Sequence, residues 1–141
     1  MFSKSTEYAL RATIFIARTS SEDNKVSIKA IAEGIGAPRA FTAKTLQQLT
    51  KDKTIILSTP GPSGGFYMTE EAKKRPIYEV IQLMGESHTI ESCVLGLPYC
   101  NDSQPCSMHN TYKHIRKDLK NMFQNKSIQE LADSNEFLLR L

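Results

Sequence analysis

Apolar residues dominate the first stretch of the chain and set up its first element. The stretch from Thr6 to Arg18 carries apolar side chains at helical spacing with few polar residues between them. Ser5 or Thr6 is placed to cap its first turn, because a hydroxyl at a helix start can accept from a free backbone N–H. The pattern predicts a well-buried first helix, followed by a polar loop over residues 20–25.

A second apolar pattern is interrupted by glycine and proline. Ser27 is expected to cap a short helix that Gly34 and Gly36 end. Pro38 is then expected to start the next helix at its first position. Two helices joined in this way are typical of a helix-turn-helix, although a plain αα-hairpin has the same pattern.

The second helix of this pair has the composition of a recognition helix. Phe41, Leu46 and Leu49 supply packing, and Arg, Lys, Thr and Gln side chains lie between them. These polar side chains are the ones that reach bases and phosphates, and recognition helices read DNA chiefly from their N-terminal turns. The pattern therefore predicts DNA contact from about residues 39–48.

A β-rich run and a glycine-rich turn follow. Residues 54–59 favour a strand, residues 60–65 (Pro-Gly-Pro-Ser-Gly-Gly) favour a turn, and residues 66–68 resume an extended run. A helix-turn-helix followed by such a hairpin is a winged helix. The wing tip carries no charged side chain, so phosphate contacts there are expected from backbone N–H groups. The predicted DNA-binding residues of the whole unit are Ser27, Arg39, Ala40, Phe41, Thr42, Lys44, Thr45, Gln48, Ser63 and Gly64.

The remainder of the chain predicts further helices around a loop. A helix from Pro76 to Met84 is stopped by Gly85, and a capping box at Ser127 starts a last short helix. Between them, apolar residues recur at steps of four and three, which predicts a long helix with a heptad-type seam. Such a seam also suits a helix lying on its own domain, but the loop before it favours a partner helix across a two-fold axis. The seam residues are Met108, Tyr112, Ile115, Leu119 and Met122.

These elements together predict a mainly α fold with a small β-hairpin wing, organised as a winged helix-turn-helix domain plus a long dimerisation helix. The expected DNA-binding domain is 1–84, the cysteine-bearing loop is 85–107 and the dimerisation helix is 108–126. Residues 127–141 are expected to form a short helix and a tail, of which 135–141 are loosely held.

Composition narrows the class of protein without deciding it. The chain has 141 residues, of which 40% are hydrophobic and 23% charged, with a net charge of +3. This balance is typical of a globular protein and permits nucleic-acid binding. No apolar run is long enough to span a bilayer and no secretory signal begins the sequence, so a cytoplasmic protein without membrane contact is expected. Because the chain offers no phosphate-binding loop, nucleophile elbow or paired carboxylates, we do not expect an enzyme.

All three cysteines fall within one loop. Cys93, Cys100 and Cys106 are separated by six and five residues, and glycine, proline, asparagine and aspartate between them favour a folded loop over a helix. If a helix begins near Pro105, Cys106 and His109 share one of its faces. Thiolates with an imidazole suit zinc or an iron–sulfur cluster. Cysteines acting as small hydrophobes remain an alternative, and a disulfide framework is disfavoured by the odd count.

Three motifs together resemble a known family. They are Ile28–Glu33 (Ile-Lys-Ala-Ile-Ala-Glu), Gly61–Phe66 (Gly-Pro-Ser-Gly-Gly-Phe) and the three cysteines. From about Met1 to Leu131 the chain resembles the Rrf-type winged-helix regulators, which include IscR, NsrR and CymR. The resemblance implies a dimeric transcription factor. Cysteine-bearing members hold a [2Fe–2S] or [4Fe–4S] cluster that senses iron–sulfur status, nitric oxide or redox state, whereas cysteine-free members hold none.

Two departures from the family pattern leave the ligand set open. The better-known members space their first two cysteines by five residues, where this chain has six. His109 stands where IscR-like proteins place a histidine ligand, whereas NsrR-like proteins use an acidic residue of the other subunit, for which Glu7 of the partner subunit is the candidate here. The expected function is a dimeric regulator that binds a pseudo-palindromic double-stranded operator, with affinity controlled by the cluster. The alternative is a structural zinc site of three cysteines and one histidine.

Overall fold

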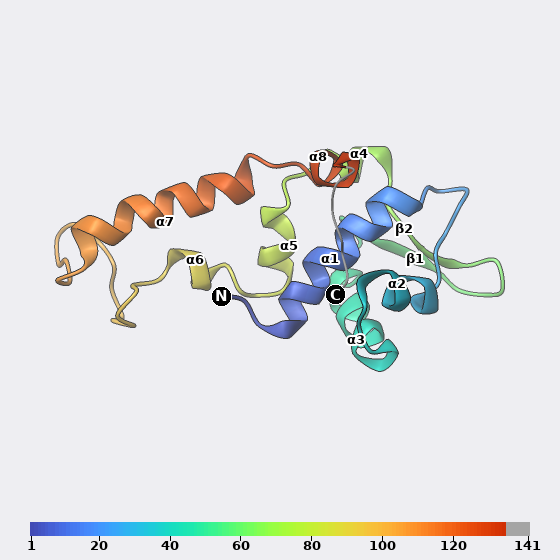
Figure 1. Ribbon diagram of the computed structural model, residues 1–141, viewed down its shortest axis with the longest axis horizontal. Helices are drawn as coiled ribbons and strands as arrows, with labels where there is room; N and C mark the ends of the chain where they lie inside the picture. Colours follow the sequence, from blue (N-terminus) through green and yellow to red (C-terminus); the bar gives the residue numbers. More distant parts are fainter. Residues whose placement is uncertain (135–141) are drawn as a thin grey trace.

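The computed structural model describes residues 1–134, and the predicted loose tail at 135–141 lies outside the described residues. Figure 1 shows a helical body at one end and a long helix that extends away from it. None of the described helices is long and apolar enough to cross a membrane. In chain order the elements are α1 Lys4–Thr19, α2 Ile28–Ile35, α3 Arg39–Leu49, β1 Leu57–Thr59, β2 Gly65–Tyr67, α4 Glu70–Lys73, α5 Tyr78–Leu83, α6 His88–Glu91, α7 His109–Gln124 and α8 Ile128–Asp133.

Helix α1 forms the centre of the body. Its residues Ala9, Ala12 and Ile16 are fully buried, and it packs against α2, α3, α5 and α8. The helix begins two residues earlier than predicted, because Ser3 rather than Ser5 or Thr6 is its cap and accepts from the backbone N–H of Thr6. The burial of one whole face of α1 explains why its sequence is so apolar.

Helices α2 and α3 form the predicted helix-turn-helix. The Ser27 hydroxyl caps α2, and Gly36 ends it in the left-handed conformation at φ 66°. The prediction that Gly34 also breaks the helix was wrong. Gly34 lies inside α2, where a Cβ atom would overlap the ring of Phe15, so the glycine allows α1 and α2 to approach closely. Pro38 is the residue before α3 rather than its first helical residue.

The hairpin that follows α3 is the predicted wing. Leu57 pairs with Tyr67 and Thr59 with Gly65 in antiparallel register. The first strand is shorter than predicted, because Ile55 and Ile56 enter the core instead of the hairpin. A further pair of backbone hydrogen bonds joins Val26, just before α2, to Phe66 in β2. The wing is therefore tied to the helix-turn-helix as well as to its own strands.

The C-terminal half differs from the sequence prediction mainly in element boundaries. Helix α5 begins at Tyr78 rather than Pro76, and the short α6 forms within a stretch expected to be a connection. The predicted capping box at Ser127 is confirmed, with Glu130 bonded in return to the backbone of Ser127. Helix α8 packs on α1, so the chain returns to the body after α7.

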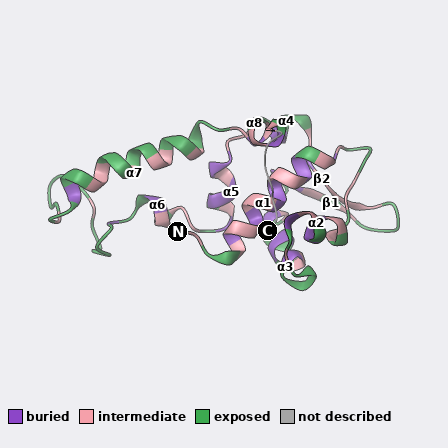
Figure 2. Ribbon diagram, viewed as in Figure 1, coloured by how far each residue is buried: buried purple, intermediate pink, exposed green. Residues whose placement is uncertain are grey.

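Helix α7 is the longest element outside the body, and Figure 2 shows it largely exposed. It contacts α5 and α6, with Leu119 packed against the buried residues of those helices. Two neighbouring residues of the same seam stay largely uncovered within the described chain, since Ile115 is 56% and Met122 51% exposed. His109 is its one buried residue.

Candidate functional site

The three cysteines and His109 lie together between α6 and the start of α7. Helix α7 begins at His109 rather than near Pro105, so Cys106 sits in the turn before it and its carbonyl accepts from the His109 N–H. The sulfur of Cys93 is 3.7 Å from that of Cys106. The sulfur of Cys100 is 3.6 Å from Nδ1 of His109. The four predicted ligands are thus brought into two close pairs.

These separations fit metal ligation. Two sulfurs bound at about 2.3 Å to one tetrahedral ion would be about 3.8 Å apart, and a sulfur and an imidazole nitrogen about 3.6 Å apart. Both pairs match those values. Within residues 1–134 no three His, Cys, Asp or Glu side chains converge closely enough to hold a single ion. Each pair by itself therefore has the separation expected of two ligands of one metal ion.

The loop also prepares Cys93 to act as a thiolate. Backbone N–H groups of Leu97 and Leu95 donate toward its sulfur and lower the pKa of the thiol. The thiolate is the form of cysteine that binds metals. The turn that follows Cys93 therefore supplies part of the chemistry of the site.

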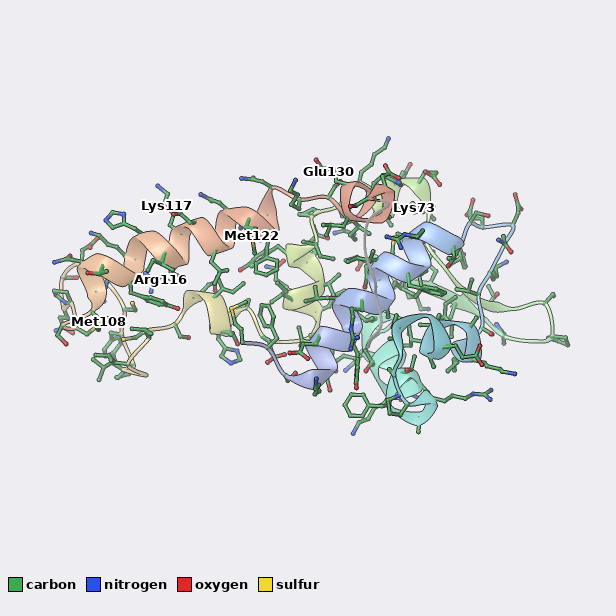
Figure 3. The ribbon with its side chains drawn as sticks, viewed as in Figure 1. Lys73, Met108, Arg116, Lys117, Met122 and Glu130 are labelled. Carbon is green, nitrogen blue, oxygen red and sulfur yellow. The ribbon has the colours of Figure 1, made fainter. Side chains whose placement is uncertain are left out.

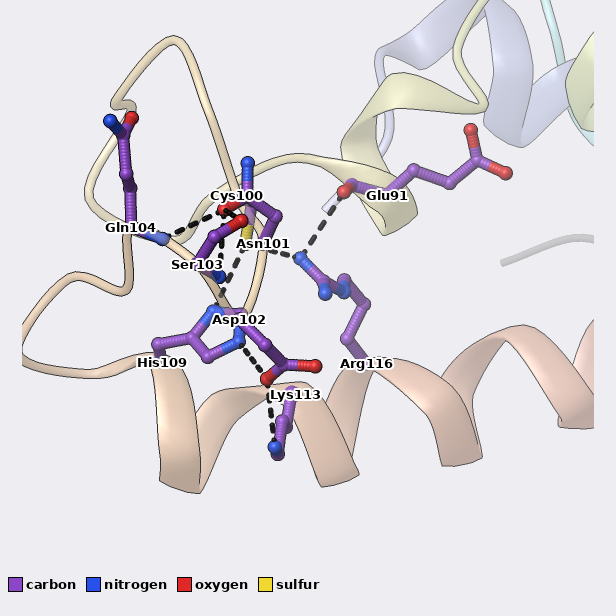
Figure 4. A network of polar contacts seen from close by, with 9 residues as sticks. All are labelled: Glu91, Cys100, Asn101, Asp102, Ser103, Gln104, His109, Lys113 and Arg116. Atoms are coloured by element: carbon purple, nitrogen blue, oxygen red, sulfur yellow. Dashed lines mark hydrogen bonds and ion pairs between the residues drawn. The ribbon is translucent and has the colours of Figure 1, made fainter.

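A second layer of groups orients His109 (Figure 4). Its Nε2 lies 3.0 Å from the carboxylate of Asp102, which also accepts from Lys113 at 3.0 Å. Lys113 and His109 together hold the pKa of Asp102 below its usual range. Because a carboxylate can only accept, Nε2 carries a proton toward Asp102, and Nδ1 faces Cys100. A histidine that binds a metal through Nδ1 needs its Nε2 held in this way.

Arg116 connects the site to the body. Its guanidinium donates to the sulfur of Cys100 at 2.6 Å and to the backbone carbonyl of Glu91 at 3.3 Å, and it points from α7 toward the loop in Figure 3. The Glu91 carboxylate accepts in turn from Tyr78 at 2.6 Å and from Lys120 at 2.7 Å. Burial and the adjacent Glu91 raise the pKa of Tyr78 to about 12. One hydrogen-bonded chain therefore runs from a candidate ligand to α5.

Asp102, Glu91 and Arg116 are absent from the residues predicted from the sequence. For Arg116 a signal was present, because His109, Lys113, Arg116 and Lys120 follow at steps of four, three and four and so share one face of α7. That polar stripe lies beside the apolar seam. Asp102 lies on the loop, where spacing along the chain does not indicate which side chains meet.

Two of the residues of α3 that were predicted to contact DNA need correction. Thr42 and Thr45 are only 1% and 3% exposed, and their hydroxyls donate to the carbonyls of Pro38 and Phe41. Both lie on the face that carries Leu46 and Leu49 into the core, so neither is available to DNA. Threonine tolerates this position because a buried hydroxyl can bond to the carbonyl four residues earlier.

The other predicted residues of α2 and α3 are exposed. Arg39, Ala40 and Lys44 are open to solvent, and Gln47, absent from the predicted set, is exposed one turn after Lys44. Phe41 is partly exposed and packs edge-on against Tyr8. The remaining two are exposed but already engaged: Ser27 in its cap, and Gln48 through a bond to the carbonyl of Leu83.

The wing offers less than predicted at Gly64. Its N–H donates to the carbonyl of Gly61 within the turn and is not available to a phosphate. A side chain at Gly64 would collide with the carbonyl of Thr59, so the glycine serves the turn itself. Ser63 is exposed at the tip, as expected.

Comparisons with known proteins agree with this architecture. The model of the Rrf2 family, described as iron-dependent transcriptional regulators, matches residues 2–134. The chain is 30% identical over 138 residues to an HTH-type transcriptional regulator of Aquifex aeolicus, covering 96% of this chain and 94% of that protein. It is 26% identical over 131 residues to IscR of Klebsiella pneumoniae, covering 93% and 78%. The solved structure of CymR of B. subtilis shares the fold with a TM-score of 0.73 at 17% identity, covering 94% of this chain and 95% of that one.

These matches confirm the resemblance and the fold class predicted from the sequence. The relatives are regulators of transcription and not enzymes. The chain belongs to the Rrf2 family of transcriptional regulators.

Proposed function

We propose that this regulator is a homodimer whose affinity for a pseudo-palindromic operator is controlled by an iron–sulfur cluster held by Cys93, Cys100, Cys106 and His109. The observation that carries the proposal is the convergence of these four side chains into two pairs at ligand separations. The similarity to IscR supports it. The cluster would supply a centre that changes on oxidation, nitrosylation or loss, so that redox state, nitric oxide or iron–sulfur supply can act on the protein.

Of the two cluster types, the pairing favours [2Fe–2S]. In that cluster each iron takes two protein ligands, whereas in [4Fe–4S] each iron takes one. Sulfurs of Cys93 and Cys106 at 3.7 Å suit a shared iron. His109 is already oriented toward Cys100, which supports it as the fourth ligand over Glu7 of the partner subunit. Within this chain, Glu7 pairs with Lys4.

Anaerobic purification tests the cluster and the zinc alternative together. We expect visible absorbance between about 320 and 460 nm and about two iron ions per chain, against about four for [4Fe–4S]. Zinc cannot give such absorbance, because its d shell is full. Colourless protein that contains stoichiometric zinc under these conditions would contradict the proposal and favour a structural Cys3His site.

The proposed DNA surface combines the exposed side of α3, the start of α2 at Ser27 and the wing tip at Ser63. Helix α3 presents Arg39, Ala40, Lys44 and Gln47 on one exposed side, with Phe41 and Gln48 at its edge. An exposed basic helix face beside a wing suits insertion into a major groove, with the two subunits of a dimer reading half-sites about one helical turn apart.

Replacing Arg39 and Lys44 by alanine is expected to weaken operator binding and to lower the salt dependence by about one unit for each phosphate that the protein no longer neutralises. Removing a bidentate hydrogen-bond pair to a base would instead cost roughly 1–3 kcal/mol and relax specificity at one base pair. Lys117→Ala/Lys126→Ala, which removes the same charge from exposed positions outside this surface, is the matched control. Equal operator affinity and equal salt slope in the two double variants would show that α3 is not the DNA-binding surface.

A further inference from the structure

The sulfurs of Cys93 and Cys106 differ from that of Cys100 in the groups that they contact. These two sulfurs are in contact at 3.7 Å. Cys100 is engaged elsewhere, with Arg116 donating to its sulfur at 2.6 Å and the His109 ring at 3.6 Å. Cys100 also lies near Cys93. The 3.7 Å contact nevertheless joins Cys93 to Cys106, and the sulfur of Cys100 is occupied by a cation and an imidazole.

We propose that, when the protein carries no metal, Cys93 and Cys106 are a specific site of reversible disulfide formation by a peroxide. A disulfide needs its sulfurs about 2.05 Å apart, so they must approach by about 1.7 Å. Rotation of the two side chains can supply a movement of this size. Both residues lie outside helices, where the backbone can follow: Cys93 comes after α6, and Cys106 precedes α7.

The reaction balances with hydrogen peroxide as the named oxidant. Cys106 is the more exposed of the two thiols, and its thiolate attacks one peroxide oxygen. The O–O bond breaks, a sulfenic acid forms and hydroxide leaves, taking up the proton that the thiol released. The sulfur of Cys93 then attacks the sulfenic sulfur, the S–S bond forms, and the departing hydroxide leaves as water with the Cys93 proton. Two thiols and one peroxide give one disulfide and two waters.

The disulfide and a bound cluster exclude one another, because they use the same two sulfurs. This consequence rests on the proposed function, whereas the disulfide itself does not. A peroxide that reaches the cluster-free protein would close the site until a dithiol reduces it. The protein would then have two cluster-free states. It would be reduced when clusters alone are scarce, and it would carry the disulfide when oxidant is present as well.

The test uses the full chain, freed of metal with a chelator, reduced and desalted without oxygen. It is treated with hydrogen peroxide, blocked with N-ethylmaleimide and divided between two digests. Chymotrypsin, cutting after Tyr99, separates Cys93 from the other two cysteines, and Asp-N, cutting before Asp102, separates Cys106 from the other two. Only a Cys93–Cys106 disulfide joins peptides across the cut in both digests. We expect that result, with Cys100 carrying maleimide and with the joined peptides absent after dithiothreitol.

A disulfide joined in one digest alone, which would include Cys100, overturns the assignment, and so does protein oxidised to sulfinic acid without a disulfide. Cys100→Ser should keep the link, whereas Cys93→Ser and Cys106→Ser should lose it. The mapping in the unsubstituted protein stands even if a variant fails to fold. Iron loading separates the two proposals: reduced protein that takes up no cluster contradicts the proposed function, and its disulfide map remains valid.

Discussion

Ile115→Glu is expected to turn the proposed dimer into a monomer. Ile115 is 56% exposed on α7, and its seam neighbours Met108 and Met122 are also exposed in the described chain. In a two-fold interface the same substitution enters from both subunits, so two carboxylates would lose water at one contact. A cost of about 3 kcal/mol or more would weaken dimerisation at least about a hundredfold. Sedimentation equilibrium over a range of protein concentrations measures it.

Asn121→Glu is the matched control for that experiment. It adds the same charge to the same helix at an exposed position on the side away from the seam. We expect it to remain dimeric and to bind the operator normally. If Ile115→Glu also remains dimeric and binds DNA as well as the control, the seam on α7 is not the interface.

Removing the three thiols is expected to change operator binding through the loop. Cys93→Ala/Cys100→Ala/Cys106→Ala should contain no iron and should differ from the cluster-loaded protein by about 1–3 kcal/mol in operator affinity, or about 5- to 150-fold. The physical reason is the position of the site between the body and α7. A bound cluster would fix the loop, and the chain from Cys100 through Arg116 and Glu91 to Tyr78 would fix α5 relative to α7.

The measurement compares the loaded protein with this variant on several operator sequences, after the variant has been shown to be folded and dimeric. The sign of the change depends on which form holds the two recognition helices at the spacing of the half-sites. Equal affinities on every operator would leave the cysteine loop as a structural element and would assign the control of DNA binding to another signal.

The elements that the sequence predicted well are those with local signals. The hydroxyls of Ser27 and Ser127 cap their own helices, and the Pro/Gly-rich turn at 60–64 forces a hairpin, so neighbouring residues alone specify these features. The errors arose where tertiary contacts decide. Gly34 looks like a helix breaker until Phe15 is placed against it, and Thr42 looks like a polar DNA-binding residue until its hydroxyl is bonded within the helix.

In the candidate site too, local signals identified some residues, whereas tertiary contacts determine the others. The cysteines and His109 could be named from their spacing and from family resemblance. Their pairing could not, because it depends on how a loop from residue 92 to 108 folds back on α7. Asp102 and Arg116, which hold His109 and Cys100, became visible only when the loop and the helix were placed together.

The exposure of α7 also bears on how the amount of this protein affects its lifetime. Of its 16 residues only His109 is buried within the chain, and an isolated helix of this length is marginal in water. Under the proposed assembly, the exposed residues of the apolar seam would become buried only when two chains meet, so by mass action the stability of α7 would rise with protein concentration. At low copy number more chains would be single, with α7 frayed and open to proteases. Slow synthesis would therefore not lead to a gradual build-up of single chains. The chains that are least able to occupy an operator would also be the first to be degraded.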